Sequence, residues 1–284
     1  MQSCTFPNVR TAFACGFDFY FITNPGGDLT AFIPTDSATG NLDAYGDGPL
    51  VPVELSADAL GYPEAERKYH AVELTYEKIW GTKWFMQASY TWSQSYGNYE
   101  GFVNSVVEQE DVAITQDFDQ PGFTEGAYGW LSNDRRHKIK LSGSYSPTDE
   151  WQLGAFFQAY SGRPLSAYGY YPDATRPEYY YAQFSYYTTN EQFSDDGSSV
   201  SVPRGSAGRT DWVYKLDLSV TYSPNVFDNK LSVGLDVFNV FDSDSSLEEN
   251  ETSETASGAS NANYRATSSF QSPRYMRARL EYRF

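Results

Sequence analysis

The chain has 284 residues, a formal net charge of −17 and a mean hydropathy of −0.55, which on average is that of a soluble protein. The charge argues against nucleic-acid binding, because no basic face is available to neutralise phosphates. The sequence has no apolar run of about 18 residues, so a transmembrane helix is excluded. The unusual feature is the content of 24 Tyr, 19 Phe and 6 Trp, which is high for a globular enzyme.

Alternation of apolar and polar residues is the main structural signal. In the segment 83–93, the alternate positions from Trp84 to Trp92 are apolar or small, and all but one of the positions between them are polar. Such a period of two places the two sets of side chains on opposite faces of a β-strand. The same pattern is found in segments 70–79, 135–145, 151–159, 212–222, 231–237 and 274–284, and less regular strands are expected at 11–23 and 28–33.

Several of these segments have the length that a tilted strand needs to cross a bilayer, about 9–11 residues. The short connections 24–27, 80–82, 146–150 and 223–229 alternate with the long connections 34–69, 94–134, 162–210 and 241–273. Periplasmic turns and extracellular loops alternate in this way in bacterial barrels, which are also rich in Tyr and Gly. We therefore predict an all-β fold, an antiparallel transmembrane β-barrel portion of about nine strands, with the long loops outside the cell.

The count of nine is odd, whereas single-chain bacterial barrels have even numbers of strands. Either an N-terminal portion is missing or one strand is miscounted. The start of the chain, Met1–Arg10, has neither the basic nor the apolar region of a signal peptide. Because a barrel protein must be exported, we expect a mature fragment, a truncated product or the tail of a longer protein. The only cysteines, Cys4 and Cys15, either form a disulfide or remain free thiols.

Several motifs, in order along the chain, resemble the Oar-like branch of the TonB-dependent receptors. They are Gly61–Leu74, Tyr90–Asn98, Asp117–Gly122, Asn133–His137, Pro203–Ser206, Asp236–Phe241 and Ser272–Tyr275. The final Phe284 also ends an apolar row that resembles the signal read by the outer-membrane assembly machinery. The resemblance implies a 22-stranded barrel whose lumen holds an N-terminal plug, and an outer-membrane receptor that imports a bulky ligand with energy relayed by TonB.

The chain lacks counterparts of the plug, the TonB-contacting box and about thirteen strands of such receptors. We therefore expect residues 1–284 to be the C-terminal part of the barrel, with TonB acting only through the missing N-terminal part. The other expected partners are outer-membrane lipid, lipopolysaccharide and the barrel assembly machinery. Two alternatives are a structural or adhesive barrel without transport activity, and a barrel enzyme. The enzyme is disfavoured, because the only histidines, His70 and His137, each begin a strand and no Ser nucleophile is placed beside them.

The candidate ligand contacts lie in the tyrosine-rich connection 162–210, since tyrosine provides a large rigid surface with a polar tip. They are Tyr168, Tyr170, Tyr171, Tyr179, Tyr180 and Tyr181; an interfacial aromatic girdle is the other interpretation. The connection 94–134 contains eight acidic residues and no Lys or Arg before residue 135, so it is either a cation site or solvated loop surface. At the rim, Arg135 and Arg136 are expected either to pair with Asp134 or Asp117 or to contact lipid phosphates. We predict no catalytic residues, no metal ligands and no cofactor.

Overall fold

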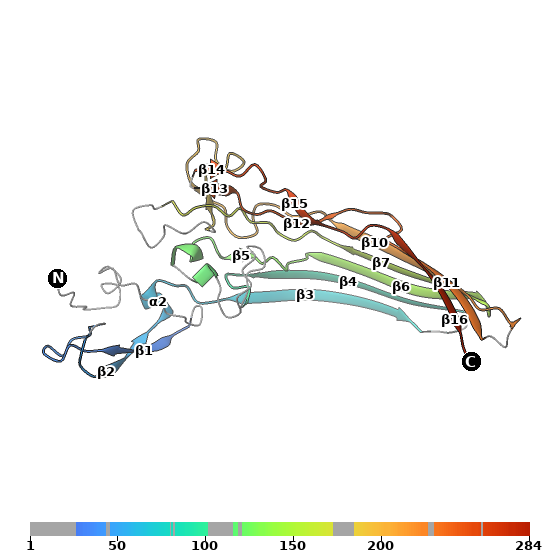
Figure 1. Ribbon diagram of the computed structural model, residues 1–284, viewed down its shortest axis with the longest axis horizontal. Coiled ribbons are helices and arrows are strands. Elements are labelled where there is room, and N and C mark those ends of the chain that lie inside the picture. Colours follow the sequence, from blue (N-terminus) through green and yellow to red (C-terminus); the bar gives the residue numbers. More distant parts are fainter. Residues whose placement is uncertain are drawn as a thin grey trace.

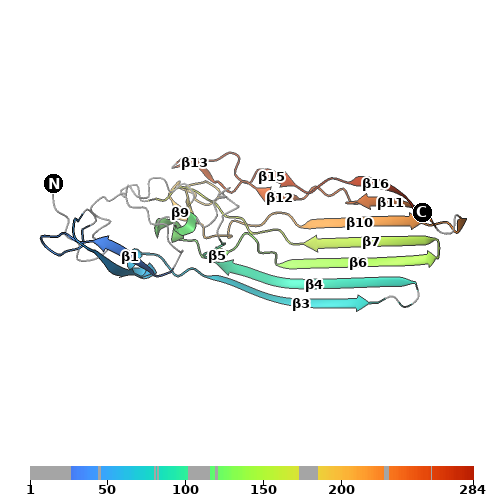
Figure 2. The same cartoon turned by 60° about the horizontal axis from the view of Figure 1, so that its bottom comes forward.

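A computed structural model describes residues 27–43, 46–79, 81, 83–101, 116–118, 121–172, 185–226, 230–256 and 258–284. One antiparallel sheet dominates it, in the strand order β16-β11-β10-β7-β6-β4-β3, with the short β5 paired to the end of β4 (Figures 1 and 2). The strands are β3 (Arg67–Lys78), β4 (Trp84–Gly97), β5 (Gly129–Trp130), β6 (His137–Thr148), β7 (Trp151–Tyr160), β10 (Val213–Tyr222), β11 (Leu231–Phe238) and β16 (Tyr275–Tyr282).

The register of the sheet aligns the predicted apolar positions of neighbouring strands. One row across five strands is Leu74, Tyr90, Ile139, Ala159 and Tyr214. The adjacent row, one residue along each strand, contains Glu73, Thr91, Lys138 and Tyr160. We call the side that carries Leu74 and Ile139 the apolar face and the side that carries Glu73 and Lys138 the polar face. The alternation predicted from sequence is therefore confirmed strand by strand.

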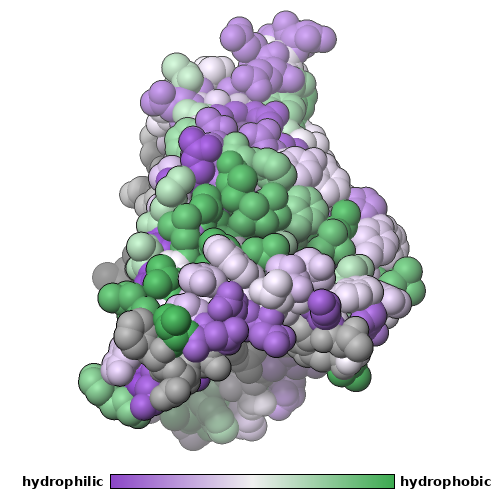
Figure 3. All heavy atoms as spheres, turned by 90° about the vertical axis from the view of Figure 1, so that its right-hand side faces the viewer, coloured by the Kyte–Doolittle hydropathy of each residue, from purple (hydrophilic) through white to green (hydrophobic). Residues whose placement is uncertain are grey.

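Lengths of the strands suit a bilayer. β3 and β6 have 12 residues each, β4 has 14, and β7 and β10 have 10 each. A tilted strand needs about 9–11 residues to cross the hydrocarbon core. Viewed from the end where the short turns lie, hydrophobic side chains gather into one patch bordered by hydrophilic ones (Figure 3).

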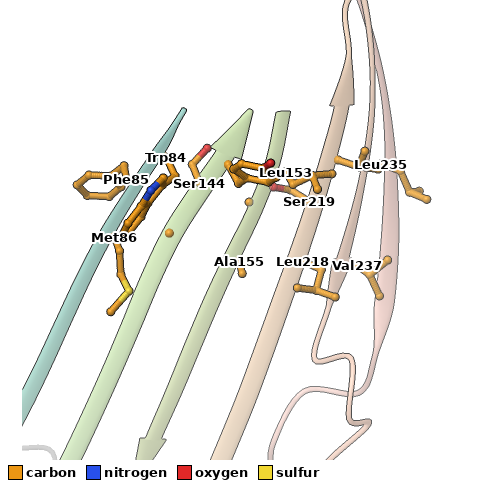
Figure 4. A pocket seen from close by; sticks show the side chains of 14 residues that line it. Trp84, Phe85, Met86, Ser144, Leu153, Ala155, Leu218, Ser219, Leu235 and Val237 are labelled. Atoms are coloured by element: carbon orange, nitrogen blue, oxygen red, sulfur yellow. The ribbon is translucent and has the colours of Figure 1, made fainter. Parts of the chain in front are cut away.

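The apolar face is hollowed near the short-turn end. Gly143, which has no side chain, is the cross-strand partner of Ala155, and the two residues leave a depression of about 780 Å³. Larger side chains from β4, β7, β10 and β11 surround it, among them Trp84, Leu153, Leu218 and Leu235 (Figure 4). Because this face meets lipid in a membrane-spanning sheet, flexible acyl chains can fill such a depression without a specific partner.

The strand predicted at 28–33 is present but does not belong to the large sheet. It is β1 (Leu29–Pro34), which pairs only with β2 (Leu50–Leu55) in a separate hairpin followed by the short helix α2 (Ala57–Leu60). With 6 residues, β1 is too short to cross a bilayer. The predicted strand at 11–23 lies outside the described residues. In the described part, the large sheet therefore has seven long strands, and the expected nine is a miscount by at least one.

The described sheet has two open edges. β3 pairs only with β4, and β16 only with β11. Six successive antiparallel pairings make β3 and β16 run in the same direction, so a direct pairing between them would be parallel. The described strands thus form an open sheet instead of a sealed barrel. Nearly every residue of β3 and β16 is exposed, which leaves both edges accessible to further strands.

The long connections gather at one end of the sheet and the short turns at the other (Figure 1). Within the long connections lie η2 (Gln116–Phe118), η3 (Pro121–Thr124) and three small two-stranded sheets. These sheets are β8 (Tyr187–Thr188) with β9 (Val200–Ser201), β12 (Ser246–Glu249) with β15 (Thr267–Phe270), and β13 (Glu254–Ala256) with β14 (Ala259–Ser260). None of the helices in the described ranges is long and apolar enough to span a membrane.

Substitutions on the two faces should have unequal costs. Leu141 lies on the apolar face of β6, and the next residue, Ser142, lies on the polar face. We expect Leu141→Arg to destabilise the protein refolded in lipid by about 2–4 kcal/mol, because it places a charge in hydrocarbon. Ser142→Arg should have a much smaller effect. Urea titration in lipid vesicles measures both, and equal losses for the two variants would contradict the assignment of the faces.

Candidate functional site

The long connections pack together into what we call the loop cap, the described residues of 98–136, 161–212 and 239–274. Most of the buried apolar side chains among the described residues lie here, not in the sheet. Two clusters form its centre: Ala127 with Tyr168 and Tyr186, and Ala167 with Val202 and Tyr264. The loops therefore form a folded unit with its own core, and side chains on its surface are held by that core.

A buried arginine joins the first two loops of the cap. Arg204, only 2% exposed, donates to Glu100 Oε1 at 2.7 Å and forms an ion pair with Asp117. Asp117 also accepts a hydrogen bond from the Tyr186 hydroxyl at 3.1 Å, and the guanidinium lies 5.3 Å from the centre of that ring. Burial raises the pKa of Glu100, and the positive charge of Arg204 opposes this shift.

A second buried arginine joins the second loop to the third. Arg163 forms ion pairs with Glu251 and with Glu248, whose Oε2 lies at 2.5 Å. The other oxygen of Glu251 accepts a hydrogen bond from the backbone N–H of Ser166 at 2.6 Å. Burial raises the pKa of Glu251 to about 7, although the charge of Arg163 acts in the opposite direction.

Asp134 connects the cap to the sheet. Its carboxylate accepts hydrogen bonds from the backbone N–H of Ser95 at 2.8 Å and from Arg209 at 2.5 Å. Arg136 Nη2 lies 3.7 Å from the same carboxylate, so one predicted rim pair is present. The other predicted pairs are not: Asp117 binds Arg204, and Arg135 donates to the carbonyl of Ser161 at 3.2 Å. The rim therefore has one acid at its centre with cations from two segments around it.

The two histidines pack against aromatic rings on the apolar face. His137 Nδ1 lies 2.9 Å from the Tyr90 hydroxyl, and the His137 ring stacks on Trp212. His70 Nε2 lies 3.3 Å from the Tyr96 hydroxyl. Both histidines thus belong to an aromatic belt near the loop end of the sheet, where amphipathic rings meet the membrane–water interface.

The candidate tyrosines have different environments. Tyr168 is only 2% exposed and packs in the core of the cap, so the prediction that it contacts a ligand is not supported. Tyr170 and Tyr171 are partly exposed; their hydroxyls donate to the carbonyl of Thr255 at 3.4 Å and to Glu125 at 2.9 Å. Tyr179, Tyr180 and Tyr181 lie outside the described residues, as do Cys4 and Cys15. Of the six candidate tyrosines, only Tyr170 and Tyr171 are both described and partly exposed.

The described acidic residues of the connection 94–134 all have partners within the protein. Glu100, Asp117 and Asp134 bind arginines, and Glu125 accepts hydrogen bonds from Tyr171 and Tyr187. No group of three or more His, Cys, Asp or Glu in the described part is arranged to hold a metal ion. Sequence reasoning missed the buried arginines at positions 163 and 204, because no local pattern distinguishes them from Arg176 and Arg209 of the same connection.

The ion pairs of Arg204 should hold the cap in place. We expect Arg204→Gln to leave the carboxylates of Glu100 and Asp117 buried without a cation, at a cost of about 3–5 kcal/mol. The cap should then become sensitive to limited proteolysis while the sheet stays intact. Arg274→Gln is the control, because its pair with Asp242 at 3.4 Å is exposed and contributes less than about 1 kcal/mol. Equal cleavage of the two variants would show that the buried pair is dispensable.

The cap should also respond to pH. The folded-state pKa of Glu251 lies above that of an exposed carboxyl. The contribution of Glu251 to the stability of the folded cap is therefore largest when its carboxyl is protonated, and this contribution is lost as the pH rises through about 7. Hydrogen exchange of the cap amides, once corrected for the intrinsic pH dependence, should therefore show less protection at about pH 8 than at about pH 6. Glu251→Gln mimics the protonated carboxyl and should flatten this slope. If protection changed with pH to the same extent in wild type and variant, Glu251 would be excluded as the cause.

Residues 38–277 match the family described as "Outer membrane beta barrel domain". The chain is 31% identical over 185 residues to the TonB-dependent transporter Oar of Myxococcus xanthus; the alignment covers 63% of this chain and 16% of that protein. The chain thus spans about a sixth of the length of this curated relative.

Among solved structures, the outer membrane transporter YddB from Escherichia coli is similar, with a TM-score of 0.47 and 13% identity over 92% of this chain and 29% of YddB. The ferric-catecholate import receptor Fiu from the same species gives a TM-score of 0.41 and 14% identity, covering 89% of this chain and 23% of Fiu. The family match spans most of the sheet and its loops, and the relative aligned in sequence is a transporter, not an enzyme. The chain therefore belongs to the outer membrane beta barrel domain family of Gram-negative bacteria and is a distant homologue of a TonB-dependent transporter.

Proposed function

We propose that this chain forms part of the wall and outer loops of a TonB-dependent transporter that imports a ligand across the outer membrane. The observation that carries the proposal is the charged polar face of the sheet. Arg277 and Arg279 of β16, Asp236 of β11 and Lys140 near the start of β6 all lie on this face. A row of charged side chains on the inner face of a barrel suits a wide, hydrated lumen. In a small structural barrel the interior is filled by packed side chains instead.

Three details of the chain fit this role. The loop cap supplies a rigid outer surface on which Tyr170 and Tyr171 could contact a ligand. TonB would act through the plug region of such a receptor, which residues 1–284 do not resemble. Phe284 is fully exposed and lies edge-on to Tyr282 at 5.4 Å between ring centres, which leaves it accessible to the assembly machinery that the sequence predicts as its reader.

The test is genetic interaction with TonB. The gene is deleted in a strain with active TonB and in a strain without it, and growth is measured on limiting iron, oligosaccharide and peptide sources. A transporter predicts slower growth on one limiting source in the first strain and no further loss in the second, because uptake already lacks its energy supply. The control is the deletion strain complemented with the wild-type gene.

A structural or adhesive barrel predicts a different result. The deletion would then change surface attachment or envelope integrity to the same extent with and without TonB. Growth on every limiting source would equal that of the parent strain. That combination would replace the transport proposal.

A further inference from the structure

A basic cleft lies on the polar face between β6 and β7, next to the loop cap. It has a volume of about 340 Å³, and its polar lining side chains are Arg135, Lys138, Lys140, Gln158 and Tyr160. Lys138 and Lys140 project from alternate positions of β6, opposite Tyr160 and Gln158 of β7. The cleft therefore combines three cations with an aromatic hydroxyl and an amide.

Among the residues that the structure describes, no carboxylate forms an ion pair with Arg135, Lys138 or Lys140. Several other cations of the same face are paired: Lys215 with Asp217 at 2.9 Å, and Arg277 and Arg279 with Asp236. The chain as a whole carries 37 acidic and 20 basic residues, so acidic side chains are abundant. An unpaired cationic cluster in so acidic a chain is a local departure from its general pattern.

The position of Arg135 is fixed without a carboxylate. Its guanidinium donates to the carbonyl of Ser161 at 3.2 Å and lies 5.2 Å from the centre of the Tyr160 ring. These contacts orient the planar group over the cleft but leave most of its five N–H donors available. A guanidinium held in this way can bind a carboxylate or phosphate through two parallel hydrogen bonds.

Dimensions of the cleft restrict the ligand. Residues two apart on a strand are separated by about 7 Å, so Lys138 and Lys140 can each hold one anionic group of the same molecule. The volume equals that of about eleven water molecules, at about 30 Å³ each. A molecule of this size with two or three anionic groups would satisfy both lysines and Arg135, and Gln158 and Tyr160 would supply neutral hydrogen bonds.

We propose that this cleft binds a small polyanion through carboxylate or phosphate groups, as a substrate subsite on the lumen wall. Its role in import rests on the transport function proposed above. Binding itself does not, because it can be measured on purified protein without TonB. A failure to bind would therefore be distinct from a failure to transport.

The experiment uses the protein purified from outer membranes in detergent at low ionic strength, where charge interactions are least screened. Citrate and pyrophosphate are titrated separately by calorimetry. We expect saturable binding of at least one of them, and a weakening of about tenfold or more in Lys138→Gln/Lys140→Gln. Lys83→Gln/Lys230→Gln is the control, since it removes the same number of charges beside two short turns at the opposite end of the sheet. It should bind as wild type does.

The two probes distinguish the ligand chemistry. Citrate binding alone assigns the cleft to carboxylates, pyrophosphate binding alone assigns it to phosphates, and both assign it to polyanions in general. The proposal is overturned if neither anion binds at millimolar concentration, or if the double variant binds as well as wild type. It is equally overturned if Lys83→Gln/Lys230→Gln weakens binding as much as Lys138→Gln/Lys140→Gln, because the effect would then be one of net charge.

Discussion

The pairing of backbone groups across the sheet is the constraint on which the rest of this structure depends. In lipid, an unpaired peptide N–H or C=O has no water to bind, so each strand must hydrogen-bond to its neighbours. The register that achieves this also decides which side chains meet lipid. A shift of one residue between β6 and β7 would move Lys138 and Lys140 from the polar face to the apolar face. Register and the polarity of the two faces are thus fixed together.

The loop cap uses a different source of order. Its connections are too long to be held by the strand ends, and its apolar core is small. Buried ion pairs therefore connect one loop to the next. Arg204 links residues 104 positions apart in the chain, and Arg163 links residues 88 apart. A buried pair adds little net stability compared with apolar packing, but removal of one partner is costly. Such pairs therefore select one arrangement of the loops over others.

This contrast explains what could be predicted from sequence. Alternation is local, so the faces of β4 could be read from Trp84 to Trp92 without knowledge of its partners. The same alternation in β1 did not reveal that its partner is β2, because a period of two identifies faces and not neighbours. Tyr168 illustrates the harder case: a tyrosine suits both a binding surface and a buried core, and only the packing against Tyr186 distinguishes them. Pairs separated by about a hundred residues leave no local pattern.

The cap and the basic cleft meet at one short segment. Asp134 and Arg136 belong to the ionic cluster beneath the cap, whereas Arg135 between them reaches over the cleft. The backbone beside Arg135 is anchored by Asp134, whose carboxylate binds Ser95 and Arg209. Because the carboxylate of Asp134 is fully buried, it cannot easily exchange these contacts for water. The buried ionic cluster of the cap thus also fixes the backbone from which Arg135 projects over the basic cleft.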